Sequence, residues 1–224
     1  MTTARAAAIV LAKELRLEFR TRELLNTTVV FALIVVALFS YAFNPTADES
    51  RQWGAGLLWL AFLFAGSLML NPSFAREHTN DTLDALRMAP ISPFAILFGK
   101  TLANFAFMAL SELILVPVFC VLYNVSVSGV AASLILVLAL GTLGLVVVGT
   151  VFSAISARAR MRELLLPLLL LPILTPLLSA CVKATGALFS VEPELNIPSI
   201  ALIAGFDVVF LTASWLLCEY LLEE

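Results

Sequence analysis

The 224-residue sequence has few charged residues, one histidine and three cysteines. Only 13% of its residues are charged, whereas 61% are hydrophobic and the mean hydropathy is +1.03. Because about a quarter of the residues in soluble domains are charged, this composition excludes an ordinary soluble domain and predicts an integral membrane protein. The 13 basic and 16 acidic residues are also too few and too evenly balanced for a nucleic-acid-binding surface.

The scarcity of histidine and the placement of the cysteines exclude most catalytic and metal centres. His78 is the only histidine, so the sequence has almost no residues from which a Ser/His/Asp triad could be built. Cys120, Cys181 and Cys218 each lie in an apolar run, without a CxxC or Cys/His pattern, and are predicted to be buried thiols. We therefore expect a non-catalytic chain with no metal ligands and no cofactor of its own.

Six charge-poor runs are long enough to cross the roughly 30 Å of membrane hydrocarbon as α-helices. Lys and Arg are unevenly divided, with 11 of the 13 on the side that carries both termini. The positive-inside rule makes that side cytoplasmic. Residues 1–224 are therefore predicted to form a single all-α transmembrane domain with both termini in the cytoplasm. The predicted spans are residues 24–43, 53–70, 102–123, 130–155, 164–188 and 197–222.

The outer end of the fifth span is irregular in sequence. Residues 179–198 contain Lys183, and the run Glu192-Pro193-Glu194 follows it. Charge and proline interrupt the apolar pattern, so this segment is either the end of a continuous span or a re-entrant piece.

Residues 1–23 are predicted to form an interfacial amphipathic helix. Apolar residues recur there at helical spacing, and basic residues share the opposite side. Such a helix either anchors the chain to membrane lipid or also docks a cytoplasmic partner. The apolar residues are Ala8, Leu11, Ala12, Leu15 and Phe19, and the basic residues are Lys13, Arg16 and Arg20.

Residues 74–93 form a cytoplasmic loop within the longest polar interruption of the chain. Asp81 is placed to cap a short helix, with Asp84 at its third position, and Leu83 and Leu86 then point to one side. A capped amphipathic helix between two spans is either a solvated linker or a coupling helix that fits a groove of a cytoplasmic motor.

The start of the third span carries an N-cap and a false phosphate-loop signal. Ser92 and Pro93 supply an N-cap and a first-turn proline. The following run FGKT contains Gly99 and Lys100, but Phe94 stands where a Walker A motif requires glycine. We expect Lys100 to extend its ammonium group to the cytoplasmic headgroups, and ATP to be bound by another polypeptide.

Two acidic residues lie deep in predicted spans, Glu112 in the third and Asp207 in the sixth. Because a charge in a membrane is costly, each is expected to face the bundle interior. They either make polar contacts between helices or line a substrate or subunit pathway, with Lys183 as a candidate partner of Asp207. The fourth span carries small residues that favour close helix packing, namely Gly141, Gly144, Gly149, Ser153 and Ala157.

The run FAREHTNDTLDALRMAPISPFAILFGK resembles the corresponding loop of ABC-2 type permeases, and most closely that of the CcmB family, the haem exporter permease subunits of cytochrome c maturation. The stretches AKELRLEFRTRE and LLLPLLLLPILTPLL also resemble that family, so the match covers most of the chain. Asp81 departs from it, since relatives commonly have glycine there. The residues that carry the resemblance in the loop are Phe74, Glu77, Thr82, Leu83, Leu86, Pro90, Pro93, Gly99 and Lys100.

The resemblance implies a six-helix permease of the bacterial inner membrane that works with two copies of a cytoplasmic ATPase, which bind ATP and Mg. It also implies a second permease copy, a haem-handling membrane protein and a periplasmic haem chaperone, with haem held mainly by these partners. ATP hydrolysis would then drive release of the haem-loaded chaperone. The implied ATPase-coupling residues are Glu77, Asp81, Leu83, Asp84, Leu86 and Arg87.

Other functions fit the residues as well. The chain could be an ABC-2 permease that exports lipid, polysaccharide or drug. From a different class, it could be a motor-free membrane scaffold, or a proton-coupled secondary transporter that uses Glu112 and Asp207. Only the ABC functions require a tightly bound ATPase, and only the haem function requires haem-maturation partners.

Overall fold

The computed structural model describes residues 2–42, 48–79, 92–157, 162–190 and 192–223. Within these ranges the chain forms eight α-helices and no strand, and six stretches are long and apolar enough to cross a membrane. The prediction of an all-α integral membrane protein is therefore confirmed. The helices are α1 (Thr3–Thr21), α2 (Glu23–Ala42), α3 (Asp48–Leu70), α4 (Pro72–Thr79), α6 (Pro93–Leu122), α7 (Ala131–Ser156), α8 (Arg162–Leu188) and α9 (Ile197–Glu223).

The structure defines where α6 begins and whether α8 is continuous. The predicted membrane-spanning run starts at residue 102, but helix α6 begins at Pro93, as the Ser92-Pro93 pair predicts. The side chain of Ser92 accepts a hydrogen bond from the backbone N of Ala95, and Pro93 occupies the first turn. α8 runs without a break to Leu188, although it contains three prolines. Residues beyond Leu188 then lead to α9.

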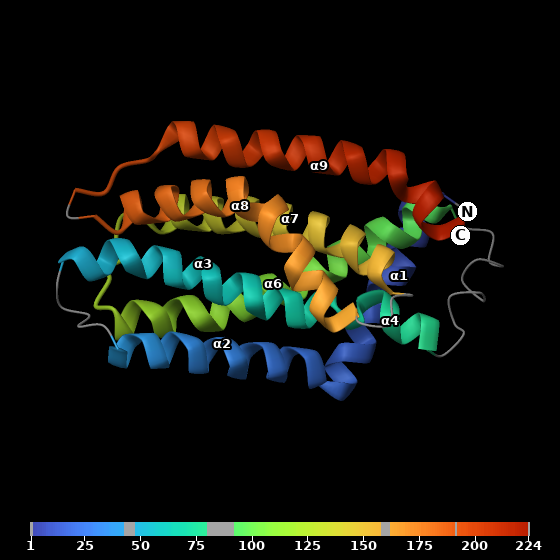
Figure 1. Ribbon diagram of the computed structural model, residues 1–224, viewed down its shortest axis with the longest axis horizontal. Coiled ribbons are helices and arrows are strands. Elements are labelled where there is room, and N and C mark those ends of the chain that lie inside the picture. The colour runs from blue at the N-terminus through green and yellow to red at the C-terminus, as the bar shows by residue number, and fades with distance from the viewer. Residues whose placement is uncertain (1, 43–47, 80–91, 158–161, 191, 224) are drawn as a thin grey trace.

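The six long helices lie side by side as one bundle (Figure 1). α3 and α7 are the most buried of the spans, whereas α2 and α9 lie on opposite outer sides and are the most exposed. α1, α4 and the end of α9 lie together at one end of the bundle, where Figure 1 marks both chain termini. The segments predicted to be cytoplasmic thus share one end.

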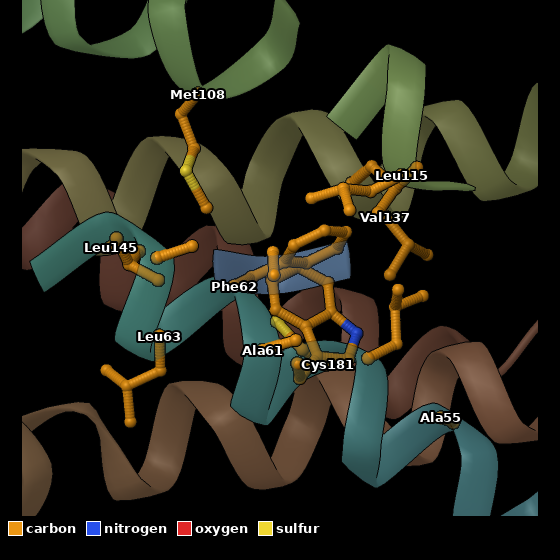
Figure 2. Packing of buried hydrophobic residues seen from close by; sticks show 14 of the residues in the cluster. Ala55, Ala61, Phe62, Leu63, Met108, Leu115, Val137, Leu145 and Cys181 are labelled. Atoms are coloured by element: carbon orange, nitrogen blue, oxygen red, sulfur yellow. The ribbon is translucent and has the colours of Figure 1, made fainter. Parts of the chain in front are cut away.

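The core lies where α3 meets α6, α7 and α8. Figure 2 shows side chains of all four helices converging there, including Phe62, Met108, Leu145 and Cys181. All three cysteines are buried free thiols, as the sequence predicts. The buried Trp59 ring of α3 completes the packing, and its Nε1 donates to Thr185 Oγ1 of α8 at 2.9 Å. A tryptophan can be buried at this position because its one polar atom has a hydrogen-bond partner.

α1 packs against α6 through small side chains, and Leu11 and Leu15 of its predicted apolar face are partly buried against the main core. Ala6, Ala7 and Val10 are buried, whereas Phe19 is 57% exposed. Gly99 of α6 permits this close approach, because a Cβ atom there would lie 2.8 Å from the Ala7 carbonyl oxygen. Small side chains at the crossing therefore allow α1 and α6 to approach closely.

Candidate functional site

The turn between α3 and α4 is held by polar groups of two neighbouring helices. We call residues 70–74 the elbow. Ser153 of α7 donates from Oγ to the carbonyl oxygen of Leu70 at 2.7 Å. Asn104 of α6 donates from Nδ2 to Ser73 Oγ at 3.2 Å and to Thr150 Oγ1 at 3.0 Å. α6 and α7 thus hold the turn that joins α3 to α4.

Lys100 is the most unexpected member of this cluster, because its side chain is only 1% exposed. Its Nζ donates to the carbonyl oxygen of Ser73 at 2.6 Å and to Glu14 Oε1 at 3.0 Å. The ammonium group also lies 4.9 Å from the centroid of the Phe74 ring. The prediction that Lys100 extends to the headgroups is therefore wrong, since its partners lie inside the protein.

Glu14 of α1 supplies the opposite charge and shares it between two lysines. Its Oε1 accepts from Lys100 and, at 3.3 Å, from the more exposed Lys13. Burial alone would raise the pKa of Glu14, but the two ammonium groups outweigh it, so this pKa lies below its ordinary value of 4.5. Glu14 is therefore a carboxylate at neutral pH, and the Lys100–Glu14 contact is an ion pair.

The predicted coupling residues follow directly after this cluster. α4 extends from Pro72 to Thr79, so the backbone of Glu77 is helical. Asp81, Leu83, Asp84, Leu86 and Arg87 lie outside the described residues, as does the short helix predicted from Asp81. The sequence did not predict α4. Its signal was the proline after Asn71, since proline is favoured in the first turn of a helix.

Glu112 is buried in the third span, as predicted, and contacts the fourth. Thr142 Oγ1 of α7 donates to Glu112 Oε1, so the carboxyl group joins α6 to α7. Glu112 also lines a cavity of about 510 Å³ between these helices, and the other described residues of its lining are apolar. The geometry therefore gives Glu112 an interhelical bond and a position beside an apolar space.

Asp207 is also buried, at 3% exposed, but neither of its carboxyl oxygens has a hydrogen-bond partner among the described residues. The side chain points at Gly144 of α7, where a Cβ atom would overlap Asp207 Oδ1. Lys183 is exposed, and within the described part of the chain it does not form the expected contact with Asp207. The absence of a side chain at Gly144 is what makes room for this acid.

Sequence reasoning missed the residues of the elbow and its polar contacts. Glu14 and Lys100 are 86 positions apart, and Asn104 reaches partners 31 and 46 positions away. Periodicity within one helix does not show which residues of distant helices will meet. The one available signal was the occurrence of Asn104 and Lys100 one turn apart at the start of an otherwise apolar span.

Comparison with known proteins gives consistent matches over most of the chain. A family model described as CcmB protein matches residues 5–217. The heme exporter protein B of Pseudomonas aeruginosa is 31% identical over 181 residues, which cover 81% of this chain and 79% of that protein. The heme exporter protein B of Rhodobacter capsulatus is 34% identical over 168 residues, covering 75% and 77%. That of Bradyrhizobium diazoefficiens is 27% identical over 207 residues, covering 88% and 93%.

Proposed function

The chain belongs to the CcmB family, and we propose that it is the membrane permease subunit of an ABC transporter that acts in haem delivery for c-type cytochrome maturation. The observation that carries this proposal is the family match, which extends over residues 5–217 and so includes five spans and all but the last residue of the sixth. A match confined to one apolar helix would carry little weight, because leucine-rich spans resemble one another.

We propose that ATP and Mg bind to two copies of a separate cytoplasmic ATPase and not to this chain. A phosphate loop needs glycine-rich backbone before a helix and a lysine free to reach the phosphates. Here the FGKT run lies inside α6, and the Lys100 ammonium group is already bonded to Glu14 and Ser73. Both features support the placement of ATP hydrolysis in a partner.

We further propose that the segment after α4 is the contact for this ATPase. α4 lies at the same end of the bundle as both termini, and the division of basic residues favours the cytoplasm for that end. Leu83 and Leu86 would supply apolar anchors. Glu77, Asp81, Asp84 and Arg87 would supply charge around them.

The remaining parts of the proposed assembly follow from family membership. They are a second permease copy, a haem-handling membrane protein and a periplasmic haem chaperone in the bacterial inner membrane, with haem held mainly by these partners. ATP hydrolysis would drive release of the haem-loaded chaperone. Within this chain, the hydrogen bond from Thr142 supports an interhelical role for Glu112. Asp207 has no hydrogen-bond partner among the described residues, so Asp207 and the exposed Lys183 are candidates for lining a substrate or subunit pathway.

Purification of the native complex tests the proposal directly. The wild-type chain should bring an ATPase and haem-maturation proteins with it. Truncation of Leu83 and Leu86 to alanine should remove about 1 to 3 kcal/mol of apolar contact each, and Glu77→Lys should weaken the contact further by reversing a charge. The triple variant should therefore lower the ATPase to permease ratio and the release of haem-loaded chaperone on addition of ATP.

A matched control makes the same kinds of change at the other end of the bundle, through Glu192→Lys with Leu195→Ala. Both residues are exposed there, so the ATPase content should stay at the wild-type level. Wild-type ATPase content and release in the triple variant would refute the contact. A wild-type complex without any ATPase would refute the assignment as an ABC permease.

A further inference from the structure

Lys100 is the one basic residue that is buried within the described part of the chain. Removing an ammonium group from water costs several kcal/mol, and a methionine of similar length would fill the same space without that cost. The charge is therefore retained at a position where it makes directed bonds. Those bonds connect three separate segments of the protein.

The contacts of Lys100 join α6 to two other helices, α1 and α4. On one side Glu14 belongs to α1, and on the other Ser73 belongs to the first turn of α4, while Lys100 itself is part of α6. Asn104, one turn further along α6, donates to the hydroxyl group of the same Ser73. α6 thus holds Ser73 by its backbone and by its side chain, at the residue from which α4 leads to the proposed ATPase contact.

We propose that Lys100 is a positioning residue that ties α4 to α1 and α6, so that a displacement of α4 by the ATPase moves these three helices together. The inference rests on the proposed function, because it needs a motor that acts on the segment after α4. The bond to the Ser73 carbonyl carries the connection to α4. The ion pair with Glu14 carries the connection to α1.

Two sets of substitutions distinguish the connection to α4 from the connection to α1. Lys100→Met keeps an unbranched side chain and removes both bonds. The double exchange Glu14→Lys with Lys100→Glu restores an ion pair between α1 and α6, but a carboxylate at position 100 has no proton to donate to the Ser73 carbonyl. Lys13→Met is the control, because it removes the exposed partner of Glu14 and leaves both bonds of Lys100 in place.

Hydrogen exchange of the purified chain in lipid nanodiscs tests the connection without any ATPase. Loss of a charged hydrogen bond should lower amide protection by about tenfold, so α1 and the hydrogen-bonded amides of α4 should both lose protection in Lys100→Met. The double exchange should recover protection in α1 but not in α4. If Lys100→Met does not fold, the protection of α4 in the double exchange alone tests the inference, since that variant retains the ion pair between α1 and α6.

The assembled complex tests the mechanical consequence. Lys100→Met should keep its ATPase, because the contact residues are unchanged, but release about tenfold less haem-loaded chaperone per ATP hydrolysed. Unchanged α4 protection, recovery of α4 protection in the double exchange, or unchanged release per ATP with the ATPase bound would each overturn the inference. A wild-type complex without an ATPase would refute the proposed function instead, and hydrogen exchange would still decide whether Lys100 holds α4.

Discussion

Replacement of Gly99 with alanine tests the docking of α1 on α6, on which the Lys100–Glu14 ion pair depends. An added Cβ atom would lie 2.8 Å from the carbonyl oxygen of Ala7 and 2.8 Å from the Cβ of Val10. Neither atom belongs to the flexible end of a side chain, so the methyl group cannot be accommodated by a rotamer change. α1 has to shift away from α6.

Gly205 of α9 provides a matched control, because a Cβ atom there would meet nothing within 4 Å. Alanine in a helix interior is more stable than glycine by about 0.5 to 1 kcal/mol, and both variants share that gain. Overpacking costs about 1 to 3 kcal/mol and applies to Gly99 alone. Gly99→Ala should therefore be less stable than Gly205→Ala by about 1 to 3 kcal/mol.

Equilibrium unfolding in mixed micelles measures this difference, and hydrogen exchange of α1 locates it. We expect α1 to lose protection in Gly99→Ala while the core of α3 and α7 keeps it. Equal stability of the two variants, with α1 still protected, would show that α1 does not approach α6 as closely as the structure places it.

Two further predictions concern orientation and the buried acid of α6. Single cysteines at Asp48 or Glu192, in a background without the native cysteines, should react with an impermeant thiol reagent added outside sealed cells, whereas one at Asp84 should not; labelling at Asp84 would reverse the proposed orientation. Glu112→Gln keeps the shape of the side chain and an oxygen that accepts from Thr142, so assembly and chaperone release should remain near wild type. Loss of release from a normally assembled complex would instead support a pathway role.

The parts of the structure that depend on local composition could be predicted from sequence. Long charge-poor runs gave the six spans, because hydrocarbon imposes one length on every helix that crosses it. Ser92 and Pro93 were correctly assigned to the start of α6. The small residues of α7 also indicated close packing, and Gly144 and Gly149 indeed lie where added side chains would overlap Asp207 and Leu70.

The errors arose where a partner is distant in sequence or where lipid and protein are equally apolar. The position of Lys100 near the start of an apolar span predicts that it extends to the headgroups, whereas its partner is Glu14, 86 positions away. The sequence of α1 does not show which of its residues contact α6, because Ala6, Ala7 and Val10 are buried there only through the close approach of a distant helix. The expected contact between Lys183 and Asp207 failed for a related reason, since Asp207 faces Gly144 of α7 whereas the side chain of Lys183 is exposed.

The burial of Asp207 bears on how the chain is assembled during synthesis. An acid near the centre of a span opposes membrane insertion by about 2.5 to 3.5 kcal/mol, and α9 carries this acid within its apolar stretch of Ile197–Cys218. α9 also follows α7 and α8 in the chain, so it leaves the ribosome after the helices that supply Gly144 and Leu177. The residues that surround the acid are thus synthesised before the acid itself. Burial of Asp207 beside Gly144 therefore requires α9 to pack against helices that precede it in the chain.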